Sequence, residues 1–140
     1  MARNGIKLYV QNEIPKINKK FEGEYEKRML KAAIRFHREV TETLTGSRSG
    51  REYKIPATEV TYRASQPNEP PASRLGHLRN SYQYIVEGKG FNAVGYVGSN
   101  LEYSHYLEYG TAKMQKRPHL IPALNSCKKE IITLFEDLIE

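Results

Sequence analysis

Hydrophobic and polar residues follow two different periods along this chain, and each change of period predicts where a strand or a helix lies. Apolar residues alternate with polar or amphipathic ones over residues 6–10, which predicts a short opening strand. From Asn12, which can cap a helix, to about Thr45, apolar residues recur every three or four positions. This stretch predicts one long helix with a charged outer face, and Gly23 is where we expect it to break or bend. Its apolar stripe consists of Ile17, Phe21, Tyr25, Met29, Ala32 or Ala33, Phe36, Val40 and Leu44.

A second helical pattern closes the chain. It predicts a helix that starts near Pro118 and runs to the C-terminus, because a proline is favourable at the start of a helix. Its regular apolar stripe consists of Leu120, Leu124, Cys127, Ile131, Leu134 and Leu138. A second stripe of Ile132, Phe135 and Ile139 widens the apolar face near the end. The first stripe is explained by burial in a core, whereas the second is either additional core or a contact between subunits.

The middle of the chain contains shorter strand patterns separated by glycine and proline. Residues 53–55 and 58–64 predict two short strands, the second half-buried, inside an extended loop at about residues 46–74. Residues 82–86 and 91–97 predict a hairpin, because glycines between them permit a reversed backbone.

Two short helical segments complete the pattern. Residues 75–80 predict a helical turn, and residues 101–109 predict a short helix that Gly110 ends. Gly95 lacks a side chain within the predicted hairpin, so a neighbouring element can approach it closely. Strands and helices are segregated along the chain, which predicts one α+β domain over residues 1–140: a small, mainly antiparallel sheet with the long N-terminal and C-terminal helices packed on it.

Composition and charge narrow the class of protein. The chain has 140 residues, a 39% hydrophobic share and a net charge of +6. That charge divides into +5 over residues 1–50, +2 over 51–90 and −1 over 91–140. No apolar run has the length of a membrane span, and no secretory signal is visible, so we expect no membrane partner. The only cysteine, Cys127, is expected to be a small buried side chain.

Candidate catalytic chemistry is sparse. The four histidines, at positions 37, 77, 105 and 119, do not show the spacing of paired metal ligands. Asp137 is the only aspartate, and no serine lies in a nucleophile elbow. We therefore predict that the protein is not an enzyme and carries neither a cofactor nor a metal. His105 and His119 are expected to support packing or an interface.

The predicted loop at 46–65 concentrates basic residues, with Tyr53 and Tyr62 between them. Three interpretations stay open for it: a solvated basic loop, a platform for single-stranded nucleic acid, or a loop that faces duplex DNA without gripping it. The basic residues concerned are Arg48, Arg51, Lys54 and Arg63.

The segment from Tyr103 to Leu124 combines three tyrosines, a Gly-Thr break and a basic loop, which suits a docking surface better than an active site. At about 100° per residue the three tyrosines cannot all point one way, so we expect some to face the core and another to face outward. Glu108 is expected on the adjacent surface, and Gly110 is expected to present Lys113, Lys116 and Arg117 as a cationic rim. The alternative is that all three tyrosines close the core. The predicted interface comprises Tyr103, Tyr106, Glu108, Tyr109, Gly110, Thr111, Arg117 and Pro118.

Several motifs together resemble a tail-component family of long-tailed bacteriophages, whose members are head–tail joining or tail-completion proteins similar to tail terminators. The strongest are Tyr103-Ser-His-Tyr-Leu-Glu-Tyr-Gly-Thr and Arg117-Pro-His-Leu-Ile-Pro-Ala-Leu. Weaker ones are Ser49-Gly-Arg-Glu-Tyr, Tyr62-Arg-Ala-Ser-Gln-Pro-Asn-Glu-Pro-Pro-Ala and Leu75-Gly-His-Leu-Arg-Asn-Ser. Asn68 and Leu75 replace the glycine and threonine that are usual in relatives, and both departures are mild.

The resemblance implies a structural virion protein of the phage neck or tail end, assembled in the host cytoplasm. Such proteins form a ring, commonly of six subunits, around the channel through which genomic DNA passes without sequence-specific contact. Their expected partners are further copies of the same chain, the tail tube protein and the head-side connector or stopper protein. A small basic nucleic-acid-binding module is the alternative function.

Overall fold

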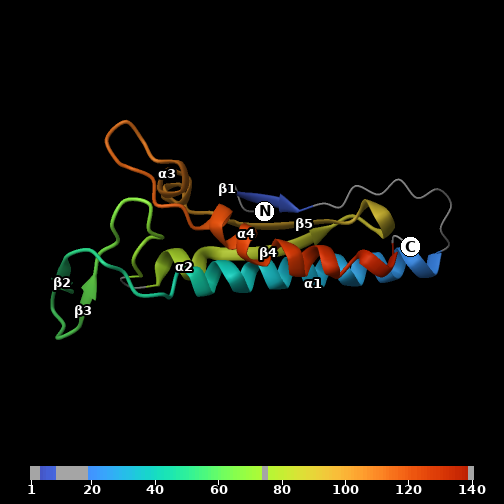
Figure 1. Ribbon diagram of the computed structural model, residues 1–140, viewed down its shortest axis with the longest axis horizontal. Coiled ribbons are helices and arrows are strands. Elements are labelled where there is room, and N and C mark those ends of the chain that lie inside the picture. The colour runs from blue at the N-terminus through green and yellow to red at the C-terminus, as the bar shows by residue number, and fades with distance from the viewer. Residues whose placement is uncertain (1–3, 9–18, 74–75, 139–140) are drawn as a thin grey trace.

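The elements of the computed structural model follow the predicted order along the chain (Figure 1), and the structure describes residues 4–8, 19–73 and 76–138. The first elements are β1 (Asn4–Leu8), α1 (Lys19–Thr43), β2 (Glu52–Lys54) and β3 (Thr61–Arg63). Then come α2 (His77–Ser81), β4 (Tyr82–Glu87), the 3₁₀ turn η1 (Gly90–Asn92), β5 (Val94–Ser99), α3 (Tyr103–Tyr109), α4 (Leu120–Thr133) and the 3₁₀ turn η2 (Glu136–Leu138). The predicted α+β class is confirmed.

The main sheet is antiparallel and has the order β1-β5-β4. The predicted hairpin therefore exists as β4 and β5, and the opening strand pairs with β5 from the other side. Ile6, Tyr84 and Val97 lie opposite one another in register and share one face of the sheet. Gly95 lies on the same face, where an added Cβ would be 3.3 Å from the Met29 sulfur of α1. The predicted close approach at Gly95 is confirmed, because α1 packs directly on it.

Helices α1 and α4 lie side by side over that face of the sheet (Figure 1). Phe36, Cys127 and Val97, from the two helices and β5, belong to one buried core, which confirms the expectation for the cysteine. Polar contacts also join the helices: the Arg35 guanidinium meets the Glu130 carboxylate at 2.7 Å.

Helix α1 does not break at Gly23, contrary to prediction. The helix runs without interruption from Lys19 to Thr43, and an added Cβ on Gly23 would meet nothing within 4 Å. A glycine inside a helix costs only about 1 kcal/mol relative to alanine, which burial of neighbours such as Tyr25 outweighs. The predicted start at Asn12 lies outside the described residues.

Helix α4 is shorter than predicted at both ends. It begins at Leu120 rather than Pro118 and ends at Thr133. Phe135 follows it into the core, just before the tighter turn η2. Of the second predicted stripe, Phe135 is therefore core, whereas Ile132 is exposed and position 139 lies outside the described residues.

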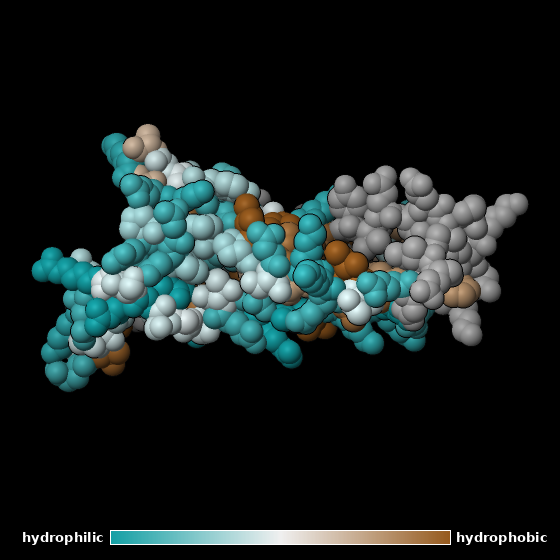
Figure 2. Space-filling model, viewed as in Figure 1, coloured by the Kyte–Doolittle hydropathy of each residue, from teal (hydrophilic) through white to brown (hydrophobic). Residues whose placement is uncertain are grey.

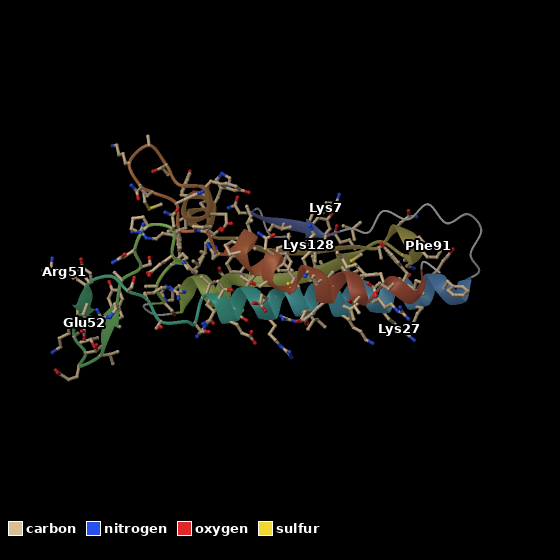
Figure 3. All side chains as sticks on the ribbon, viewed as in Figure 1. Lys7, Lys27, Arg51, Glu52, Phe91 and Lys128 are labelled. Carbon is tan, nitrogen blue, oxygen red and sulfur yellow. The ribbon has the colours of Figure 1, made fainter. Side chains whose placement is uncertain are left out.

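The predicted extended loop contains a small hairpin, here called the arm (residues 49–65). Its strands β2 and β3 pair with Tyr53 opposite Tyr62, and these two rings stack with centroids 5.9 Å apart. The second predicted strand is half-buried only in its later part: Tyr62 and Ala64 are partly buried and alternate with exposed residues. Val60, just before β3, is largely exposed because the arm extends away from the core. Figure 3 shows Arg51 on the arm and Phe91 at the far end of the molecule.

Candidate functional site

Glu108 connects the end of helix α3 to the start of helix α4. Its carboxylate accepts hydrogen bonds from the backbone N–H groups of His119, Leu120 and Ile121 at 2.7, 2.9 and 2.9 Å. The next residue, Pro122, has no N–H group, so the first-turn donors that a helix leaves unpaired are all accounted for. The negative charge also lies at the positive end of the helix dipole, where it is most favourable.

This arrangement corrects the expectation that Glu108 lies on the surface. The residue is only 4% exposed, because its carboxylate turns inward to the start of α4, where its hydrogen bonds with His119 and Leu120 are buried. Sequence periodicity missed it, since a glutamate on a short helix normally faces solvent. The sequence did carry a signal for this capping role: the Glu-Tyr-Gly motif is followed by a helix that has Pro122 in its first turn.

His119 extends the connection to the sheet, so its predicted packing role is confirmed. Its Nε2 lies 2.5 Å from the hydroxyl of Tyr82, and its Nδ1 lies 3.2 Å from both the Arg117 carbonyl and the Glu108 carboxylate. In the neutral ring, Nδ1–H donates and Nε2 accepts the tyrosine proton. Burial lowers the pKa of His119 despite the opposing effects of the Arg117 carbonyl and Glu108. Burial, and to a smaller degree Glu108, raises the pKa of Tyr82.

We predict that this histidine makes the fold sensitive to acid. Because its folded pKa is below its unfolded value of about 6.5, the unfolded chain binds the proton more readily as pH falls through that value. The contribution of neutral His119 to the free energy of unfolding is therefore fully present above about pH 6.5. Below that pH the free energy of unfolding falls by up to about 1.4 kcal/mol per pH unit. Urea denaturation at a series of pH values measures this slope.

The exposed His105 provides the matched control for that measurement. His105→Gln should retain the wild-type dependence of stability on pH, whereas His119→Gln should flatten it between pH 7 and 5. Equal slopes in the wild type and His119→Gln would contradict the prediction.

The three tyrosines of helix α3 all lie at the surface. Tyr103, Tyr106 and Tyr109 are 45%, 50% and 61% exposed. The interpretation in which they close the core is therefore wrong, and so is the expectation that some of them face inward. Ser104 and Glu108 occupy the buried side of the helix instead. The exposed His105 ring lies 4.9 Å from the ring of Tyr109, which extends this aromatic surface.

Gly110 ends α3 as predicted, with φ at 78°, a left-handed value that suits glycine. The chain then forms a short loop in which the Thr111 N–H donates to the Met114 carbonyl at 2.8 Å. Lys113 and Lys116 of this loop are exposed, as the predicted cationic rim requires.

The end of that loop is tied back to α3. The Arg117 N–H donates to the Leu107 carbonyl at 2.6 Å, and the side chains of Arg117 and Pro118 are half-buried. Arg117 therefore belongs less to the exposed rim than expected.

The basic residues of the 46–65 region are mostly engaged within the subunit. The Arg48 guanidinium donates to the carbonyls of Thr43 and Pro71, and burial lowers its pKa. Lys54 pairs with Glu59 at 3.0 Å.

The remaining two basic residues also have neighbours on the arm. Arg63 pairs with Glu52 at 3.5 Å, and Arg51 lies over the ring of Tyr53. All four basic residues thus have neighbours within the free subunit, as the solvated-loop interpretation expects.

The structure brings the two predicted groups of site residues to one end of the molecule. The Asn68 N–H, from the proline-rich run after the arm, donates to the Lys116 carbonyl at 3.0 Å. The arm and the loop after α3 therefore project from the same end, beyond the end of α1 (Figure 1). Within residues 4–8, 19–73 and 76–138, no cluster of side chains suited to holding a metal ion is present. In the same ranges, none of the helices is long and apolar enough to cross a membrane.

Comparison with known proteins identifies the family of the chain. Residues 10–110, more than half of the chain, match the model of the HK97 gp10-like family, described as "Bacteriophage HK97-gp10, putative tail-component". No curated protein and no solved structure matches the chain significantly. The match includes the arm, strands β4 and β5 of the main sheet, and α3 with its exposed tyrosines. This chain therefore belongs to the HK97 gp10-like family of bacteriophage tail components.

Proposed function

We propose that this tail component forms a closed ring, of six subunits, that completes the tail tube and joins it to the head-side connector. As a member of its family, the protein is a structural part of the virion. The ring would assemble in the cytoplasm of the host and surround the channel for genomic DNA. One observation carries the proposal: the rigidly held helix α3 presents Tyr103, Tyr106 and Tyr109 to solvent together.

The physical case rests on how α3 is held. Glu108 fixes the end of α3 to α4, so the backbone of α3 needs little ordering when a partner binds, and less free energy is lost on association. Tyrosine has an apolar body and a polar tip, which suits a surface exposed in the free subunit and buried in a complex. A ring also needs two different complementary surfaces, because its contacts are heterologous.

The DNA-facing surface is proposed to include the loop after α3. Among the described residues, the side chains of Lys113 and Lys116 have no ion-pair or hydrogen-bond partner, in contrast to Lys54 and Arg63. Exposed lysines interact with phosphates through charge alone, which suits DNA that passes without sequence-specific contact.

We predict that replacing Tyr106 and Tyr109 together by alanine abolishes assembly without unfolding the subunit. Both side chains are at least half exposed, so each loss should cost less than about 1.5 kcal/mol and leave the subunit folded. A tyrosine at the centre of an interface contributes about 2 kcal/mol, so association should weaken by at least about a hundredfold. Size-exclusion chromatography with light scattering, alone and with tail tube protein, measures this loss.

Tyr84→Ala is the matched control, because Tyr84 is exposed to a similar degree but lies on the sheet. It should assemble like the wild type. Normal assembly by the double variant, or its failure to fold, would refute the role proposed for α3.

A further inference from the structure

A cleft of about 350 Å³ opens where the end of α1, the base of the arm, α2 and α3 meet. Its apolar walls include Leu44, Leu78 and Leu107. Two arginines, Arg79 and Arg117, also line it.

Both arginines are available to a binding partner. Among the residues that the structure describes, the Arg79 guanidinium has only a long contact of 3.4 Å, to the Asn80 side chain. The Arg117 guanidinium makes no hydrogen bond or ion pair with the described residues. The cleft therefore combines a hydrophobic floor with uncompensated positive charge, which suits an apolar side chain next to a carboxylate.

The tip of the arm has the complementary chemistry. Val60 is 58% exposed there, and the side chain of its neighbour Glu59 is 95% exposed. Figure 2 shows a hydrophobic patch near the end of the arm. Glu59 pairs with Lys54 in the free subunit, but an ion pair this exposed is weak and is readily exchanged for a better one.

The backbone holds this tip in one conformation. The Ile55 N–H donates to the Val60 carbonyl at 2.9 Å, and the Thr58 N–H donates back to the Ile55 carbonyl at 3.2 Å. Between them, Ala57 has φ at 63°, a left-handed value that is unfavourable for a residue other than glycine. Such strained positions persist where the surroundings enforce them and often accompany functional contacts.

The tip does not reach the cleft of its own subunit. Tyr62 and Ala64, at the base of the arm, line the cleft, whereas Val60 and Glu59 do not. The arm instead extends away from the body (Figure 1). The tip and the cleft are thus two different surfaces of one molecule that can only meet between copies.

We infer that the arm tip of one subunit docks in the cleft of the next copy of this chain. Val60 lies against the leucines, and Glu59 faces Arg79 and Arg117. The inference rests on the proposed ring and identifies a contact that joins its subunits. The contact is heterologous, as a ring requires, and Tyr103, which lines the cleft, makes it continuous with the α3 surface.

Disulfide trapping between two variants that each carry one added cysteine tests the inference. Val60→Cys places a thiol on the tip, and Ala72→Cys places one in the wall of the cleft at little cost in volume. The native Cys127 is fully buried, so the wild type should not cross-link. An equal mixture of the two variants should form a disulfide-linked dimer under mild oxidation, because docking raises the local thiol concentration. Each variant alone should not.

Lys31→Cys, on the exposed face of α1, replaces Ala72→Cys in the control mixture. The tip–cleft mixture should cross-link at least about tenfold faster than this control. Light scattering on the wild type under the same conditions, with and without tail tube protein, separates the two proposals. If the wild type assembles but the two mixtures cross-link equally, the tip–cleft contact is refuted and the ring stands. If the wild type stays monomeric throughout, both are refuted.

Discussion

Replacing Glu108 by alanine is expected to lower the free energy of unfolding by about 3 kcal/mol, since each buried donor left unpaired costs about 1 kcal/mol or more. The change leaves the N–H groups of His119, Leu120 and Ile121 without their acceptor and removes a favourable charge from the helix dipole. For a domain of this size the midpoint of thermal unfolding should fall by about 10 °C. Urea denaturation and thermal scans at pH 7.5 measure the two effects.

Two further variants separate the capping role from a general effect of charge. Glu108→Gln keeps the shape and one good acceptor oxygen, so its loss should be clearly smaller than that of Glu108→Ala. Glu102→Ala removes an exposed glutamate just before α3, and its stability should stay within about 0.5 kcal/mol of the wild type. Equal stabilities for Glu108→Ala and Glu102→Ala would show that the hydrogen bonds to α4 contribute little.

Replacing Phe36 by alanine should have an effect at least as large, a loss of about 3–5 kcal/mol. Phe36 is fully buried in the core under the sheet, where α1 and α4 meet. Its removal would leave a cavity that the surrounding helices cannot close, because their positions are also set by polar contacts such as Arg35 with Glu130. The midpoint of urea denaturation measures the loss.

Phe21 is the matched control on the same helix. It belongs to the same sequence stripe but is 40% exposed, near the start of α1. Phe21→Ala should therefore cost less than about 1.5 kcal/mol, because much of its ring remains in water in the folded state. If Phe21→Ala lowered the free energy of unfolding as much as Phe36→Ala, the core would have to extend to Phe21, which would contradict the structure.

The contrast between these two phenylalanines shows where sequence patterns lose precision. Helical periodicity assigns both to one apolar stripe, because the spacing repeats regularly along the helix. Periodicity gives the direction in which a side chain points and does not give the length of helix that other elements cover. The sheet and α4 decide that length, and they come from residues far away in the sequence.

The class of fold, the order of the elements and the family could all be inferred from local sequence patterns and motifs. The alternation that begins at Ile6 and the apolar pattern over residues 82–97 indicated strands, and the helical stripes indicated the two long helices, since each period allows only one regular backbone. The glycine stop at Gly110 was also predictable, because few other residues adopt its backbone angle. The hairpin and its antiparallel pairing followed from these local signals.

Tertiary structure alone decided the role of Glu108, the exposure of the α3 tyrosines and the pairing of the arm cations. Glu108 is buried because the start of α4, eleven residues later, brings unpaired N–H groups to it. Once that side of α3 is occupied, its tyrosines are left facing solvent. The guanidinium of Arg48 donates a hydrogen bond to the carbonyl of Pro71, 23 residues away, and this partner cannot be read from the sequence. Each outcome depends on which polar groups meet across the fold, and a periodic pattern carries no information about such partners.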